Sequence, residues 1–201
     1  MYGCVPLDVS MPVGEDETIY LEIEEKLFYD RAIYIKNPIT DSEATLIVAK
    51  LLTLAMESST KDIGIYINTV ANDISAIMSI INTIEILPCK VHTICLSLAD
   101  GYAALLLASG TRGYRVAMPH STINLYQHQE RFGGKQSDVT VDYEKFLKDR
   151  DKLRRVLSNV TDKTVGEIAT LMSSGVCYLD ANQAKEFGII DDIIGVAKNR
   201  R

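Results

Sequence analysis

The chain has 201 residues, of which 47% are apolar and 24% are charged, a composition typical of one folded domain with a sizeable core. It carries 21 basic and 27 acidic side chains, so its net charge is −6. Without a basic stripe, this balance argues against nucleic-acid binding, which needs clustered lysine and arginine. No apolar run reaches the roughly 20 residues of a membrane span, so we expect no membrane partner.

The cysteines and histidines follow no recognisable ligand or disulfide spacing. The four cysteines lack a CxxC pair, and His92, His120 and His128 form neither HxxxH nor HExxH. We therefore expect no metal, no cofactor and free thiols in a reducing compartment. The first ten residues lack the basic and apolar regions of a secretory signal.

In the first half of the chain, predicted strands and helices alternate. An acidic and mobile start is expected at Gly14–Thr18. The elements then expected are a strand at Ala32–Lys36, a helix opening after Thr40, a strand at Ile63–Asn68, a helix from Asp73 to before Pro88, a strand at His92–Leu98 and a helix at Tyr102–Ser109. This order favours right-handed parallel crossovers and predicts an α/β fold.

The second half is dominated by one long, charged helix. The elements expected here are strands at Arg115–Ala117 and Ile123–Gln127, helices at Asp138–Asn159, Thr164–Ser173 and Asp180–Phe187, and a strand at Ile189–Ile194. The helix at Asp138–Asn159 is longer than a compact domain needs. We interpret it as an extension whose apolar stripe faces a partner or the body, although an ordinary packed surface helix fits the pattern equally well.

Two predicted turns between a strand and a helix are the places where chemistry is expected. Backbone N–H groups at such turns can stabilise an anion, and a nucleophile at the helix start gains from the helix dipole. However, Asn68–Asp73 contains no glycine, and Leu98–Tyr102 has no serine, threonine or cysteine at its apex.

From about Glu15 to Ile194 the chain resembles the Clp protease proteolytic subunits, the ClpP family. The stretches that carry the resemblance are Asp62–Asn68, Thr93–Ala104, Met118–Gln127 and Ala184–Asp191. The resemblance implies a crotonase-like spiral of βαβ units, the head, with a projecting handle helix. It divides the chain into 1–31 (N-terminal axial segment and first helix), 32–127 and 161–194 (head), 128–160 (handle) and 195–201 (tail).

The resemblance also locates the family's catalytic positions, and every one of them is changed. The serine falls on Gly101, the histidine on Tyr126, and the aspartate on Val176, or on Gly175 if the register slips by one. The two glycines of the oxyanion turn are replaced by Ala71 and Asn72. Glycine offers no nucleophile, and tyrosine, with a pKa of about 10, is a poor general base. No catalytic residue is therefore predicted.

A ClpP-like chain without the triad resembles ClpR, the non-catalytic type found with ClpP in plastids and cyanobacteria. This implies a homo- or hetero-oligomeric heptameric ring with ClpP, an AAA+ ATPase partner, and a location in a plastid (chloroplast stroma or apicoplast) or the cyanobacterial cytoplasm. The family's ATPase-docking positions correspond to Leu52, Gly64, Tyr66, Ile86, Val116 and Ile194. Several are smaller than the family's aromatics, which predicts weakened docking; plain core residues are an equal alternative. An Arg–Asp pair that stacks the rings is replaced by Gly175 and Val176, so that ion pair is predicted absent.

The leading prediction is a non-catalytic structural subunit of a Clp protease in ATP-dependent protein degradation. A hydrolase with a relocated nucleophile would use Ser97 or Ser109 with His128. However, His128 lies about 7 Å along the strand from the family's position, too far for attack geometry. A crotonase-like acyl-CoA enzyme would use Asp73 or Asp100 as its acid. A free-standing adaptor that binds client proteins would be a monomer.

Overall fold

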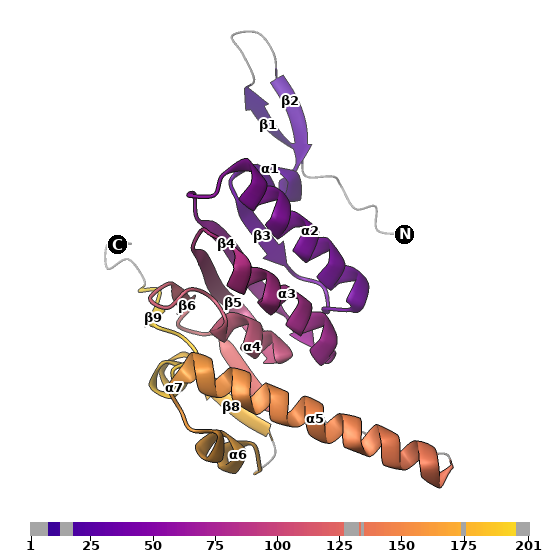
Figure 1. Ribbon diagram of the computed structural model, residues 1–201. Helices are drawn as coiled ribbons and strands as arrows, with labels where there is room; N and C mark the ends of the chain where they lie inside the picture. Colours follow the sequence, from indigo (N-terminus) through magenta and orange to yellow (C-terminus); the bar gives the residue numbers. More distant parts are fainter. Residues whose placement is uncertain (1–7, 13–17, 127–132, 134, 174–175, 196–201) are drawn as a thin grey trace, which may run out of the picture.

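The computed structural model describes residues 8–12, 18–126, 133, 135–173 and 176–195 (Figure 1). Its main feature is a seven-stranded sheet with helices packed against it. The strands β3 (Ala32–Ile35), β4 (Ile63–Ala71), β5 (Val91–Gly101), β6 (Arg115–Ala117) and β9 (Asp192–Ile193) run parallel in that order. The mixed α/β fold predicted from the alternating pattern is confirmed.

The sheet forks along β5, the longest strand. The first half of β5 pairs with β6, whereas its second half pairs in parallel with β7 (Thr122–Tyr126). On its other side, β7 pairs antiparallel with β8 (Val176–Asp180). The fork places the carboxyl ends of β4, β5 and β7 side by side, which is where ligands bind in sheets of this kind.

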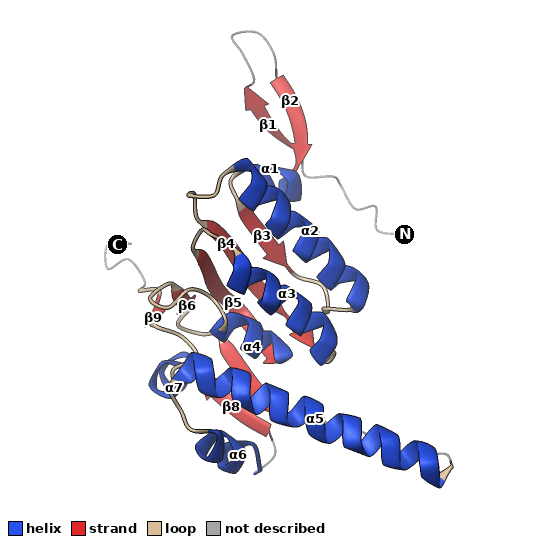
Figure 2. Ribbon diagram, in the orientation of Figure 1, coloured by secondary structure: helices blue, strands red, loops and turns tan. Residues whose placement is uncertain are grey.

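Helices form a layer over one face of this sheet. Figure 1 shows α2 (Asp41–Glu57), α3 (Ile74–Ile86) and α4 (Tyr102–Ala108) lying side by side, and Figure 2 separates this layer from the strands behind it. The shorter α1 (Ile23–Tyr29) precedes β3, and α6 (Val165–Ser173) and α7 (Ala181–Phe187) flank β8 in the chain. Within the described part of the chain, no helix has the length and apolar character needed to cross a bilayer.

The core is formed by apolar residues that alternate with partly exposed residues along the strands. In β4, Ile63, Ile65 and Ile67 are fully buried, whereas the residues between them are partly exposed. Each such isoleucine contributes roughly 1.5–3 kcal/mol by leaving water. The next helix, α3, begins where the Asp73 carboxylate accepts the N–H groups of Ser75 and Ala76, at 2.8 and 3.2 Å. This cap confirms the predicted start of the helix.

Three parts of the chain differ from the prediction. The described residues flanking the expected mobile start form a hairpin of β1 (Asp8–Pro12) and β2 (Thr18–Glu22); most of Gly14–Thr18 lies outside the described residues. Strand β8 was not predicted at all. The predicted strand at Ile189–Ile194 is wrong for its first three residues: the Ile189 N–H still bonds to Ala184 O in α7, and only Asp192 and Ile193 pair with β6.

The predicted long helix is α5 (Gln136–Thr161), whose 26 residues span about 39 Å. Figure 1 shows its N-terminal part projecting beyond the rest of the chain. Leu153 and Leu157, near its C-terminal end, are buried in the core, whereas Val141 and Tyr143 are 66% and 49% exposed. The apolar stripe is therefore buried at the C-terminal end of the helix, whereas toward its N-terminal end Phe146 and Leu147 are half-buried and Tyr143 is exposed. The expected boundary at residue 128 lies outside the described residues.

Candidate functional site

The turn between β5 and α4 lies at Gly101. This buried residue ends β5 and caps α4 with φ 63° and ψ −125°. A residue with a side chain is strained in this conformation, and glycine is not. Strained strand-to-helix turns of this kind hold the nucleophile of many hydrolases at their apex. The turn is thus present, but its apex carries no side chain.

The predicted oxyanion positions lie beside this turn. Ala71, fully buried at the end of β4, pairs with Gly101 across the two strands. Among the described non-glycine residues, only Arg31 and Asp162 have a positive φ, so Ala71 and Asn72 do not. The backbone here therefore lacks the left-handed geometry that glycines permit.

The other two triad positions face each other on neighbouring strands. Tyr126 at the end of β7 pairs directly with Val176 at the start of β8. Strand β7 lies next to β5, with Asp100 opposite Asn124. The fold therefore brings Gly101, Tyr126 and Val176 to one end of the sheet. The alternative position, Gly175, lies outside the described residues.

A polar pair next to the turn was not predicted. The Asn124 amide donates a hydrogen bond of 2.6 Å to the Asp100 carboxylate, across the strands that lie next to each other at the fork. Asn124 is only 8% exposed. The pair could have been found only by knowing which residues of β5 and β7 stand opposite each other. Asp100, a candidate acid of the acyl-CoA alternative, is therefore engaged by a neighbouring amide.

The candidate serines of a relocated hydrolase lie away from the turn. The pairing of β4 with β5 is irregular here, because Ile67 and Thr69, two residues apart on β4, pair with Cys95 and Ala99, four residues apart on β5. Ser97 lies in this irregular stretch and is exposed. It precedes Gly101 by four residues, or about 13 Å of strand. The Ser109 hydroxyl donates to Leu105 O at 2.8 Å, at the end of α4. His128 lies outside the described residues.

His92 and the second candidate acid of the acyl-CoA alternative also have other partners. His92 Nε2 lies 2.9 Å from Asp62 Oδ2, and its ring contacts the Tyr114 ring at a tilt of 45°, with the ring centres 4.4 Å apart. Asp73, the second candidate acid, is occupied by capping α3. In the described stretches of the chain, no group of three or more histidine, cysteine or acidic residues could hold a metal ion. No observation favours the acyl-CoA alternative.

The six predicted docking positions form two patches on a single chain. Tyr66 and Val116 each stand opposite Ile94 on the sheet, and the Tyr66 ring comes within 3.4 Å of where a Gly64 Cβ would be. Ile194, 38% exposed, bonds through its N–H to Ala117 O beside Val116. Leu52 and Ile86, 41% and 74% exposed, belong instead to the helical layer, on α2 and α3. We call Gly64, Tyr66, Val116 and Ile194 the sheet patch; Ile94, which lies between Tyr66 and Val116 in the sheet and was not predicted, is only 8% exposed.

Comparison with known proteins identifies the class to which this fold and turn belong. Residues 15–197 match the Clp protease family, so the chain belongs to that family. A relative is the ATP-dependent Clp protease proteolytic subunit 1 of Shouchella clausii (strain KSM-K16). It is 34% identical over 194 residues, which cover 94% of this chain and 100% of the relative. The predicted family is thus confirmed, and the relative bears the name of a proteolytic subunit.

Proposed function

We propose that this member of the Clp protease family is a non-catalytic structural subunit that assembles with ClpP-type subunits in an ATP-dependent protease. The observation that supports this most directly is the bare apex of the turn. Gly101 has the backbone conformation that presents a nucleophile at such turns, yet it offers only hydrogen. A serine protease forms its acyl intermediate on a side-chain oxygen, and none exists at this position.

The neighbouring positions support the same proposal. Tyr126 and Val176, which face each other on β7 and β8, provide neither an imidazole nor a carboxylate. The Ala71–Asn72 turn lacks the glycines of an oxyanion hole. Three catalytic roles and the oxyanion turn are therefore lost together, whereas the sheet that would align them is kept. This combination fits a subunit retained for assembly.

The proposal includes a heptameric ring, homomeric or mixed with active ClpP, and docking of an AAA+ ATPase. A pocket made from all six docking positions would need the sheet patch of one copy beside Leu52 and Ile86 of the next, an arrangement that a ring would provide. For location, we propose a plastid, with the cyanobacterial cytoplasm as the alternative, on the resemblance to ClpR alone.

The decisive experiment is hydrolysis of a fluorogenic peptide by the purified chain, with labelling by a fluorophosphonate as a second measurement. We expect a rate indistinguishable from buffer and no labelled serine. The variants Ser97→Ala and Ser109→Ala serve as controls. Turnover or labelling that disappears in either variant would contradict the proposal, because the nucleophile would then have moved.

Assembly is tested separately by native mass spectrometry of the chain alone and mixed with an active ClpP. We expect masses that contain both chains and seven subunits per ring. If the chain remains a monomer in both samples, the adaptor alternative replaces the ring subunit, whatever the outcome of the hydrolysis assay.

A further inference from the structure

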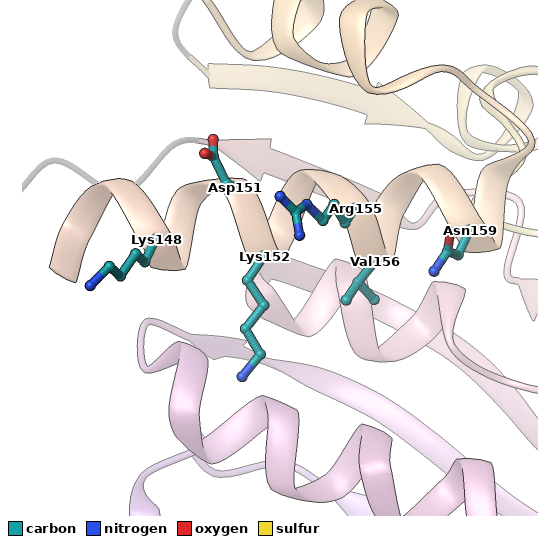
Figure 3. Close-up of a pocket in the computed structure, with 6 residues that line it drawn as sticks. All are labelled: Lys148, Asp151, Lys152, Arg155, Val156 and Asn159. Atoms are coloured by element: carbon teal, nitrogen blue, oxygen red, sulfur yellow. The ribbon is translucent and has the colours of Figure 1, made fainter. Parts of the chain in front are cut away.

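One face of α5 carries a stripe of cations around a shallow hollow. The hollow has a volume of about 310 Å³ and is lined by Lys148, Asp151, Lys152, Arg155, Val156 and Asn159 (Figure 3). Figure 3 shows Lys148, Lys152 and Val156 projecting from one side of the helix and Asp151 from the opposite side. We call Lys148, Lys152 and Arg155 the basic stripe. All three are exposed.

Each cation of the basic stripe has an acidic residue three or four positions earlier on α5, namely Glu144, Asp149 and Asp151, but none is close enough for an ion pair. None of the three cations forms an ion pair with a described residue. The single acid of the hollow, Asp151, lies 3.6 Å from Arg154 and 3.9 Å from Arg150, so other cations share its charge. Like charges three and four residues apart on a helix repel each other. An anion bound along the stripe would remove this repulsion.

The spacing of the stripe indicates the shape of that anion. Lys148 and Lys152 are four residues apart, so they are separated by about 6 Å along the axis of α5. In an extended chain, side chains on the same face recur about every 6.6 Å, which nearly matches this step. The whole stripe extends over about 10 Å, more than one phosphate group fills.

We propose that the basic stripe binds an extended acidic segment of another protein chain, with carboxylates on alternate residues. The two lysines and Arg155 pair with successive carboxylates, and Arg155 can hold one of them by two parallel hydrogen bonds. Val156 offers an apolar contact between the charges, and the Asn159 amide can donate to the backbone of the segment. The interaction does not depend on whether the chain is catalytic.

The test is fluorescence anisotropy of a labelled (Glu-Ala)4 peptide titrated with the full chain, and with (Gln-Ala)4 as the neutral probe. We expect only the acidic peptide to bind, with an affinity that falls as salt is added. The net charge of −6 disfavours non-specific binding of an acidic probe. The variant Lys152→Glu should weaken binding at least tenfold. Lys61→Glu, which makes the same charge change at an exposed lysine outside the stripe, should not.

A second copy of the chain can occupy the stripe before the probe does, so the same variants are compared by sedimentation. If Lys152→Glu dissociates an assembly that Lys61→Glu leaves intact, the acidic segment belongs to another copy, which supports the proposal. The proposal is overturned if the two variants behave alike in both measurements. It is also overturned if both peptides bind equally, or if tripolyphosphate binds at the stripe and the acidic peptide does not.

Discussion

An ion pair between buried Arg115 and half-buried Asp191 joins separate parts of the head. Arg115 is 5% exposed, and its guanidinium bonds to both oxygens of Asp191, at 2.6 and 3.0 Å. The same guanidinium donates to Ala108 O at the end of α4 and to Val160 O near the end of α5. Asp191 also accepts the Gly113 N–H at 2.7 Å. One side chain thus fixes β6, two helices and the segment that leads into β9.

We predict that Asp191→Asn lowers the free energy of unfolding by about 3 kcal/mol, because it leaves a buried guanidinium without its counter-charge. Urea unfolding at pH 7 measures this. The control is Asp192→Asn, whose carboxylate pairs with Lys185 at the surface and whose loss should matter much less. Equal losses for the two variants would show that burial of the Arg115 pair is unimportant.

The same pair predicts how stability depends on pH. Burial acts to raise the pKa of Asp191, but hydrogen bonds from Arg115 and from the backbone outweigh it and hold that pKa below its usual range. The folded protein therefore binds this proton less readily than the unfolded chain does. The contribution is fully present above the ordinary pKa of about 3.9, and it is lost as the pH falls from there through the lower pKa of the folded protein. The gap between wild type and Asp191→Asn should narrow below about pH 4, and a constant gap from pH 7 to 3 would contradict this.

At the scale of the elements, the end of α7 depends on a glycine that is constrained twice. Gly188 caps the helix with φ 93°, and a Cβ there would come within 2.8 Å of the Thr161 carbonyl oxygen, at the end of α5. Gly113 has a similar φ of 86° but nothing within 4 Å of the equivalent position. Alanine substitution at the two glycines therefore distinguishes two free-energy costs. The cost of a positive φ arises at both positions, whereas the cost of steric overlap arises only at Gly188.

We predict that Gly113→Ala costs about 1 kcal/mol, the strain of a positive φ alone. Gly188→Ala should cost about 3 kcal/mol, because the Thr161 backbone must also move. Thermal unfolding of both variants measures the difference. If both melt at the same temperature, the contact between α7 and the end of α5 is looser than the structure describes.

At the scale of the whole molecule, one half of α5 lies in the core and the other half projects into solvent. Its C-terminal half is part of the core through Leu153 and Leu157, whereas Val141 and Tyr143 are large apolar residues exposed on the projecting half. Contiguous exposed apolar residues are typical of surfaces that contact other proteins, whereas single ones are common on any surface. In the proposed assembly, another subunit would contact this half of the helix.

We predict that Val141→Glu and Tyr143→Glu leave the unfolding transition of the chain unchanged, since neither side chain is buried. Each should weaken self-association or association with ClpP about tenfold, because a charge in a contact must lose its water. Light scattering across a dilution series measures this. Thr140→Glu adds the same charge at an exposed neighbouring position. If Thr140→Glu weakens association as strongly, the effect is general charge repulsion rather than contact.

The sequence by itself determined the α/β class, most helices and parallel strands, and the family, because apolar periodicity and local caps such as Asp73 are encoded over short stretches of chain. It also located Gly101, whose missing side chain needs no structure to be noticed. The tertiary structure alone decided that β8 is a strand, that Asn124 bonds to Asp100, and that Arg115 meets Asp191. In each of these pairs the partners are separated by 24 residues or more, and no local pattern records which residue will stand opposite another once the chain has folded.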